Sequence, residues 1–101
     1  MALHSRLLLL EDDPAIARTV AYALEREGLQ VRHSLLLHDA RQQIHAEAFD
    51  LLVLDVGLPD GNGLDLLREL RQGGATGLRT RASAPVLMLS AQGDEIDRVL
   101  G

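Results

Sequence analysis

The stretch Asp50-Leu51-Leu52-Val53-Leu54-Asp55 is the clearest strand signal in the chain, an apolar run with an acidic residue at each end. A continuous run of this kind is typical of a strand that is buried on both faces of a parallel sheet. The following segment, Gly57-Leu58-Pro59-Asp60-Gly61-Asn62-Gly63, is rich in turn-forming residues and predicts a loop. Asp55 is therefore predicted to lie where a buried strand ends and a loop begins.

Two further apolar runs lie on either side of this strand in the sequence. Leu7 to Leu10 leads into the acidic triplet Glu11-Asp12-Asp13, and Pro85-Val86-Leu87-Met88-Leu89-Ser90 ends at a hydroxyl residue. The segment from Leu29 to His33 alternates between apolar and polar residues, which predicts a short strand near a sheet edge. The chain is thus expected to form about four strands.

Amphipathic segments separate these runs and predict about four helices, so the sequence indicates an α/β fold. Alternating strands and helices with continuous apolar strands are typical of a doubly wound parallel sheet that is covered on both faces. The predicted helices span about residues 14–28, 38–48, 63–71 and 94–100. The residues predicted to face inward are Ile16, Val20 and Leu24 in the first helix, Ala40 and Ile44 in the second, and Leu64, Leu67 and Leu70 in the third.

Length and composition indicate one domain over residues 1–101. The chain is 47% hydrophobic, which is enough for a core, and it contains no cysteine that could form a disulfide or thiolate metal site.

A net charge of −5 and scattered arginines argue against nucleic-acid binding by this segment. No stretch approaches the roughly 20 apolar residues of a membrane span, so we expect a cytoplasmic protein. The four histidines show no ligand spacing and predict no zinc site.

Polar side chains at three strand ends are expected to form one site. In an open parallel sheet the chemistry lies at the carboxyl ends of the strands, where the strand order switches. Glu11 and Asp12 follow the first strand, Asp55 ends the third, and Ser90 ends the fourth. Carboxylates gathered in one crevice repel one another unless a cation neutralises them, and Mg²⁺ binds through carboxylates, water and phosphate. The sequence therefore predicts a magnesium site at this edge of the sheet.

Each of these residues is assigned a chemical role. A carboxylate can act as a nucleophile and form an acyl phosphate, and Asp55 is the best candidate because it ends the central strand. Glu11 and Asp12 are then predicted to hold Mg²⁺ together with Asp55, with the backbone carbonyl of Gly57 as a further ligand. The Ser90 hydroxyl is predicted to donate a hydrogen bond to a phosphoryl oxygen and to shift the following helix.

Each motif taken alone has a simpler interpretation. An acidic triplet such as Glu11-Asp12-Asp13 is more often a helix cap, because acidic residues interact favourably with the N-terminal end of a helix dipole. Asp55 or Ser90 alone would be an ordinary residue at a strand end. The order and spacing of the three motifs together favour the phospho-acceptor interpretation.

Three motifs follow one another along the chain: Leu8-Leu9-Leu10-Glu11-Asp12-Asp13-Pro14, then Leu52-Val53-Leu54-Asp55-Val56-Gly57-Leu58-Pro59-Asp60-Gly61-Asn62-Gly63, then Pro85-Val86-Leu87-Met88-Leu89-Ser90-Ala91. This order resembles the receiver domains of two-component response regulators, most of all those that carry a C-terminal winged-helix DNA-binding domain. The resemblance implies a flavodoxin-like fold, Mg²⁺, phosphorylation by a sensor histidine kinase, and control of transcription through a DNA-binding output domain outside this chain. It also implies that Asp55 is the phospho-acceptor and Ser90 the switch hydroxyl.

The sequence departs from the family pattern near its C-terminal end. Receiver domains continue with a fifth strand that ends in a lysine and with a fifth helix, whereas this chain ends at Gly101 and contains no lysine. We therefore expect a receiver domain that is partial at its C-terminus. The strand at 85–90 would then be an unpaired sheet edge. We therefore expect that the chain is either unstable alone or completed by another copy, as a homodimer or a strand-exchanged dimer. Leu35-Leu36-Leu37 and the long connection from Gln72 to Ala84 also differ from the family.

Two other functions are alternatives to a phosphorylation-dependent switch. A degenerate receiver without its lysine would act as a phosphorylation-independent interaction module through the surface of its last helix. A phosphatase with Asp55 as nucleophile is disfavoured, because such enzymes usually carry a second aspartate two residues on, and Gly57 occupies this position. We therefore expect that the protein is not an enzyme.

Overall fold

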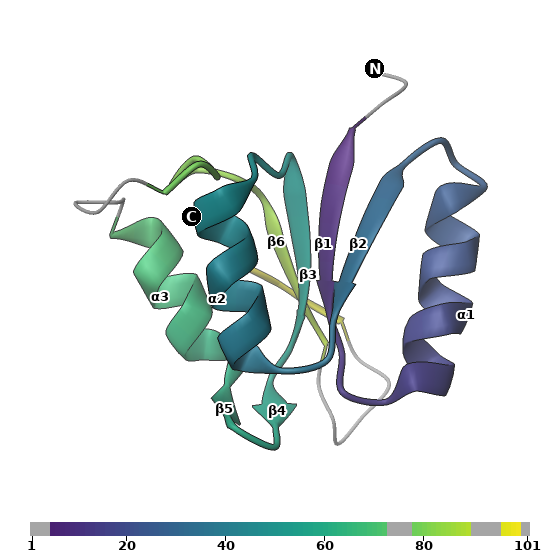
Figure 1. Ribbon diagram of the computed structural model, residues 1–101, viewed down its shortest axis with the longest axis horizontal. Helices are drawn as coiled ribbons and strands as arrows, with labels where there is room; N and C mark the ends of the chain where they lie inside the picture. The colour runs from purple at the N-terminus through teal and green to yellow at the C-terminus, as the bar shows by residue number, and fades with distance from the viewer. Residues whose placement is uncertain (1–4, 73–77, 90–95, 100–101) are drawn as a thin grey trace.

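The central sheet is built from five strands, β1 (Arg6–Leu10), β2 (Gln30–Ser34), β3 (Leu51–Asp55), β6 (Val86–Leu89) and β7 (Ile96–Val99). The computed structural model describes residues 5–72, 78–89 and 96–99. In space the strands are ordered β2-β1-β3-β6-β7, and Figure 1 shows the first four of them side by side. Neighbours are parallel from β2 to β6, and β7 runs antiparallel to β6. The prediction that the segment from Leu29 to His33 forms an edge strand is confirmed, since β2 lies at one end of the sheet.

Helices cover both faces of the sheet. Helix α1 (Pro14–Glu25) packs on one face, and α2 (Leu37–Ala46) and α3 (Gly63–Arg71) lie side by side on the other (Figure 1). A small antiparallel hairpin of β4 (Gly57–Leu58) and β5 (Gly61–Asn62) links β3 to α3. This arrangement confirms the doubly wound, flavodoxin-like α/β fold. In the described part of the chain, no helix combines the length and the apolar character needed to cross a membrane.

The core consists of two layers because side chains of a strand alternate between its faces. Leu8 and Leu10 of β1 pack with α2 and α3, whereas Leu7 and Leu9 pack with α1. All four leucines are fully buried, as the continuous apolar run predicted. The inward positions predicted for α2 and most of those for α3 are confirmed; the buried residues are Ala40, Ile44, Leu67 and Leu70, with Leu64 partly buried.

The inward face predicted for α1 is wrong at Ile16, which is 48% exposed. The buried residue in this turn is Ala17, and Val20, Ala21 and Leu24 complete the packed stripe. A helix of 3.6 residues per turn cannot keep a strict four-residue spacing on one face, so the stripe rotates away from Ile16.

The helix predicted over 94–100 is wrong for Ile96–Val99, which form β7. Residues 94, 95 and 100 lie outside the described residues. The prediction that the strand at 85–90 is an unpaired edge is wrong for the same reason, since Val86 pairs with Val99 and Leu89 pairs with Ile96. An open strand edge is a strong template for pairing, and the β-branched residues of this segment suit an extended backbone. In this structure β7 therefore occupies the edge of β6 that the sequence predicted to be open.

The long connection between α3 and β6 is anchored to the C-terminal end of α2. The backbone amides of Arg79 and Thr80 each donate to the Ile44 carbonyl at 3.1 Å. The Thr80 hydroxyl, only 1% exposed, accepts from the Phe49 amide at 3.1 Å and donates to the Glu47 carbonyl at 2.7 Å. Thr80 thus satisfies backbone groups that have left the helix. The sequence indicated no role for this connection. In the structure it forms hydrogen bonds with the backbone at the C-terminal end of α2.

Replacing Thr80 with valine is expected to lower the free energy of unfolding by about 1–3 kcal/mol, because a buried amide and a carbonyl lose their partner. Urea unfolding of the metal-free chain measures the effect. Thr19→Val is the matched control, since the Thr19 hydroxyl donates to Ala15 on the exposed side of α1. Equal stability losses at Thr80 and Thr19 would contradict this account.

Candidate functional site

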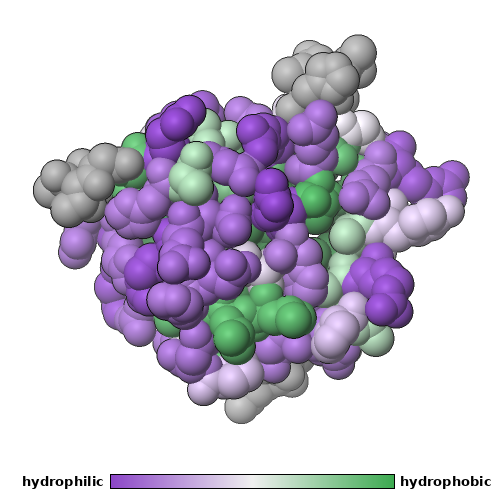
Figure 2. Space-filling model, in the orientation of Figure 1, coloured by the Kyte–Doolittle hydropathy of each residue, from purple (hydrophilic) through white to green (hydrophobic). Residues whose placement is uncertain are grey.

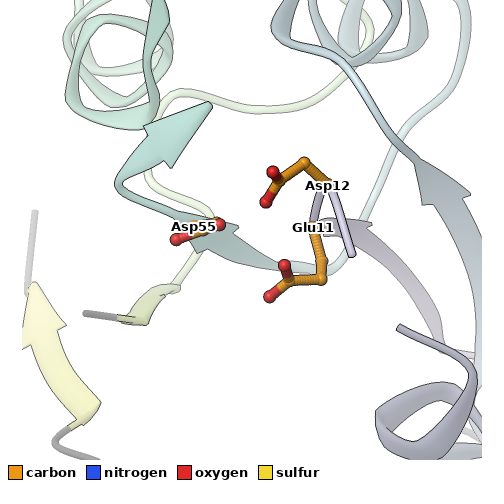
Figure 3. Close-up of side chains that lie close together, drawn as sticks. All are labelled: Glu11, Asp12 and Asp55. Carbon is orange, nitrogen blue, oxygen red and sulfur yellow. The ribbon is translucent and has the colours of Figure 1, made fainter. Parts of the chain in front are cut away.

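Three acidic side chains meet at the carboxyl ends of β1 and β3. Leu10 and Leu54 are register partners in the sheet, so the residues that follow them, Glu11 and Asp55, emerge next to each other. One carboxylate oxygen each of Glu11, Asp12 and Asp55 lies within 4.8 Å of the others. Figure 3 shows the three side chains gathered at these two strand ends. The sequence prediction that distant loops bring these carboxylates together agrees with this geometry.

Backbone contacts fix the acidic segment after β1. The Asp13 amide donates to the Glu11 carboxylate at 3.0 Å, and the Glu11 amide donates to the Ser34 carbonyl at 3.1 Å. His33 Nε2 lies 2.8 Å from the Glu11 carbonyl oxygen, which can only accept, so this nitrogen carries the proton. Asp13 also caps α1, with its side chain accepting from Ala15 and Ile16. The segment is therefore both a helix cap and part of the acidic cluster.

Burial and mutual repulsion raise the pKa of two of these carboxyl groups. Asp55 is 5% exposed and Glu11 is 6% exposed. Desolvation is the largest cause of the raised pKa of Asp55, followed by its hydrogen bond with Asp12 and the charge of Asp12, and the amides of Gly57 and Val56 oppose the rise. Desolvation also leads the causes that raise the pKa of Glu11; the Asp13 amide opposes it, and the charges of Asp55 and Asp12 add to it.

This donor set fits a hard divalent cation. Three carboxylate oxygens converge, and two of the carboxyl groups are buried where an uncompensated negative charge is costly. Oxygen ligands of this kind are those that Mg²⁺ and Ca²⁺ prefer. Gly57 is the first residue of the β4–β5 hairpin that follows Asp55. Ser90, the predicted switch hydroxyl, lies outside the described residues.

Comparison with known proteins identifies the family. The family model described as "Response regulator receiver domain" matches residues 7–100. The chain belongs to the response regulator receiver domain family. Transcriptional regulatory protein CpxR of Klebsiella pneumoniae subsp. pneumoniae (strain HS11286) is 40% identical to this receiver domain over 99 residues, which cover 96% of this chain and 38% of CpxR. The receiver domain thus spans well under half the length of the curated relatives that it matches.

Two solved structures show the same fold. The non-phosphorylated HemR receiver domain from Leptospira biflexa is 35% identical, with a TM-score of 0.74 over 87% of this chain and 65% of that one. A response regulator protein from Burkholderia pseudomallei, described with a phosphorylated aspartic acid, calcium ion and citrate, is 28% identical. Its TM-score is 0.73, over 85% of this chain and 46% of that one.

Sequence reasoning missed the contacts of two residues in the loop that follows Asp55. A side chain at Gly63 would place its Cβ 2.1 Å from the Asp55 carbonyl oxygen. The Asp60 carboxylate accepts hydrogen bonds from the first two amides of α2. The only sequence signal for either was the density of turn-forming residues between Gly57 and Gly63, which predicts a loop without saying what the loop contacts.

The Asp55 carboxyl group is expected to make the free energy of unfolding of the metal-free receiver domain decrease as the pH rises above about 4. Because the pKa of Asp55 is raised in the folded state, the folded state binds more protons than the unfolded state between the ordinary value of 3.8 and the raised value. The free energy of unfolding therefore falls with pH in this window, by about 1.4 kcal/mol for each unit of the shift.

Urea unfolding of the wild-type chain and of Asp55→Asn between pH 4 and neutrality, without divalent cations, measures this contribution together with the part of the Glu11 shift that the Asp55 charge causes. The stability advantage of Asp55→Asn is expected to grow with pH and to shrink when Mg²⁺ is added. A difference that does not change with pH would show that the Asp55 carboxyl group carries no folding-linked shift.

Proposed function

We propose that this receiver domain is a phosphorylation-dependent switch in which Asp55 accepts a phosphoryl group from a sensor histidine kinase. The observation that carries the proposal is the convergence of three carboxylate oxygens within 4.8 Å, with the Asp55 carboxyl group at the end of the central strand. The Burkholderia relative supports it, since that protein is described with a phosphorylated aspartic acid and a calcium ion.

Glu11, Asp12 and Asp55 would hold Mg²⁺, with the Gly57 carbonyl as a further ligand. A bound Mg²⁺ neutralises the carboxylates and offsets the charge of the incoming phosphoryl group. An Asp55 carboxylate oxygen forms the bond to phosphorus while the bond from phosphorus to the donor histidine breaks, and the product is an acyl phosphate. Asp55 must be deprotonated for this attack, and a bound cation would favour the deprotonated form because it offsets the Asp12 charge that helps to raise the Asp55 pKa.

The phosphorylated domain would act on a DNA-binding output domain outside this chain, as the similarity to transcriptional regulatory proteins suggests. Ser90 would donate a hydrogen bond to the phosphoryl group. We place the protein in the cytoplasm and assign it no catalytic turnover of its own. A homodimer stays a prediction that light scattering can test.

Phosphorylation with acetyl phosphate tests this function. The chain is incubated with acetyl phosphate and Mg²⁺, and its intact mass is expected to increase by one phosphoryl group, with no increase when Mg²⁺ is chelated. Absence of label would favour the alternative, a phosphorylation-independent interaction module. Steady release of phosphate without a labelled intermediate would instead point to an enzyme.

A further inference from the structure

We propose that Asp60 is a positioning residue for the Mg²⁺ site: by capping the N-terminus of α2, it holds the β4–β5 hairpin and with it the Gly57 carbonyl. The proposal deepens the function proposed above and rests on it, because it concerns a support of the same site. Asp60 itself touches neither the acidic cluster nor the phosphoryl group in this scheme.

Helix α2 has no cap of its own. Its N-cap residue is Leu36, which makes no side-chain hydrogen bond to the helix, whereas α1 and α3 are capped locally by Asp13 and Asn62. Leu35 and Leu36 are 44% and 43% exposed. Figure 2 shows a hydrophobic patch over this connection between β2 and α2. The leucines thus occupy the positions from which a polar side chain would satisfy the first helical amides.

Asp60 supplies the missing cap from another part of the chain. One oxygen of its carboxylate accepts from the Leu37 amide at 2.9 Å, and the other accepts from the His38 amide at 3.0 Å. These hydrogen bonds lower the pKa of Asp60. A negative charge at the N-terminus of a helix also interacts favourably with the helix dipole. Both carboxylate oxygens are therefore engaged with α2.

Close packing shows that this contact fixes the hairpin. A Cβ at Gly61 would lie 2.6 Å from a side-chain carbon of Leu37, so the hairpin and the first turn of α2 are in direct contact. Leu37 itself is buried. Figure 1 shows the hairpin next to the N-terminal end of α2. Asp60 lies in the turn between β4 and β5, and Gly57 of β4 pairs with Asn62 of β5. Holding the turn therefore restrains Gly57.

Four variants test the role of Asp60. Mg²⁺ binding and stability are measured separately for each variant. The Mg²⁺ dissociation constant comes from an NMR titration of the amides, and stability comes from urea unfolding without metal. Asp60→Ala is expected to weaken Mg²⁺ binding about tenfold, as the loss of a supporting contact around a metal site commonly does. Asp60→Asn keeps one acceptor oxygen, so its Mg²⁺ dissociation constant is expected to lie between those of Asp60→Ala and wild type. Asp65→Ala, which removes an exposed carboxylate from the first turn of α3, is expected to bind like wild type.

The double variant Asp60→Ala with Leu36→Ser separates positioning from simple capping. Leu36 has the extended backbone of an N-cap residue, so a serine there can cap α2 locally. The double variant is expected to recover stability while Mg²⁺ binding stays weak, because the hairpin is still detached from α2.

Three results would overturn the proposal. Wild-type affinity in Asp60→Ala would show that the hairpin needs no support from this residue. Joint recovery of stability and Mg²⁺ binding in the double variant would show that Asp60 only caps α2. Both outcomes leave the proposed function intact, whereas a wild-type chain that binds no Mg²⁺ overturns the proposed function together with this inference.

Discussion

Asp55→Asn is expected to abolish phosphoryl transfer from acetyl phosphate to the chain, because an amide oxygen cannot replace the carboxylate nucleophile. The same substitution is expected to stabilise the metal-free protein. It removes a buried negative charge that lies beside Asp12 and Glu11, and this charge is costly in the absence of a cation. A variant that is more stable and yet inert distinguishes a lost nucleophile from a damaged fold. Intact mass and urea unfolding measure the two effects.

Asp50→Asn is the matched control, since Asp50 directly precedes the opposite end of β3 and its carboxylate accepts from the Arg6 amide. This variant is expected to be labelled at the wild-type rate. Persistent labelling of Asp55→Asn would mean that another carboxylate, such as Glu11 or Asp12, is the acceptor.

Gly63→Ala is expected to destabilise the fold on the order of 3 kcal/mol and to slow labelling of Asp55. The added Cβ would lie 2.1 Å from the Asp55 carbonyl oxygen and 3.6 Å from Met88 Cε. The first of these contacts is with backbone, so no change of side-chain rotamer can relieve it. The Gly63 amide also donates to the Val56 carbonyl at 2.9 Å, which ties the start of α3 to the residue after Asp55.

Gly57→Ala controls for the general cost of a substitution in this loop, since a Cβ there meets no atom within 4 Å. The free energy of unfolding of Gly57→Ala is expected to stay within about 1 kcal/mol of the wild-type value. If Gly63→Ala were as stable as Gly57→Ala, the packing of α3 against the end of β3 would be looser than the structure indicates.

Strands β1, β2, β3 and β6 could be predicted because their apolar patterns are local, and the meeting of Glu11 with Asp55 follows from the parallel pairing of β1 and β3. A continuous apolar run such as Leu7 to Leu10 has few alternatives to a buried strand, and parallel pairing then brings Glu11 and Asp55 to one edge. The residues of α1 that face the sheet could not be predicted in the same way. Its contact with the sheet depends on small residues such as Ala17, whose hydrophobicity is weaker than that of the exposed Ile16.

Contacts between distant segments account for what the sequence did not reveal. Ile96–Val99 form β7 because the edge of β6 is available as a partner, and four residues carry too little periodicity to distinguish a strand from a helix. The cap of α2 comes from Asp60, more than twenty residues further along the chain. An aspartate in a turn has no local feature that indicates which helix it contacts.

Mg²⁺ binding to the 101-residue chain tests most directly whether the acidic side chains form a cation site. In an NMR titration, the amides around Glu11, Asp12, Asp55 and Gly57 are expected to shift together and to saturate. Asp12→Asn is expected to weaken this binding about tenfold or more. Shifts that never saturate, that lie elsewhere in the chain, or that persist unchanged in Asp12→Asn would contradict the account.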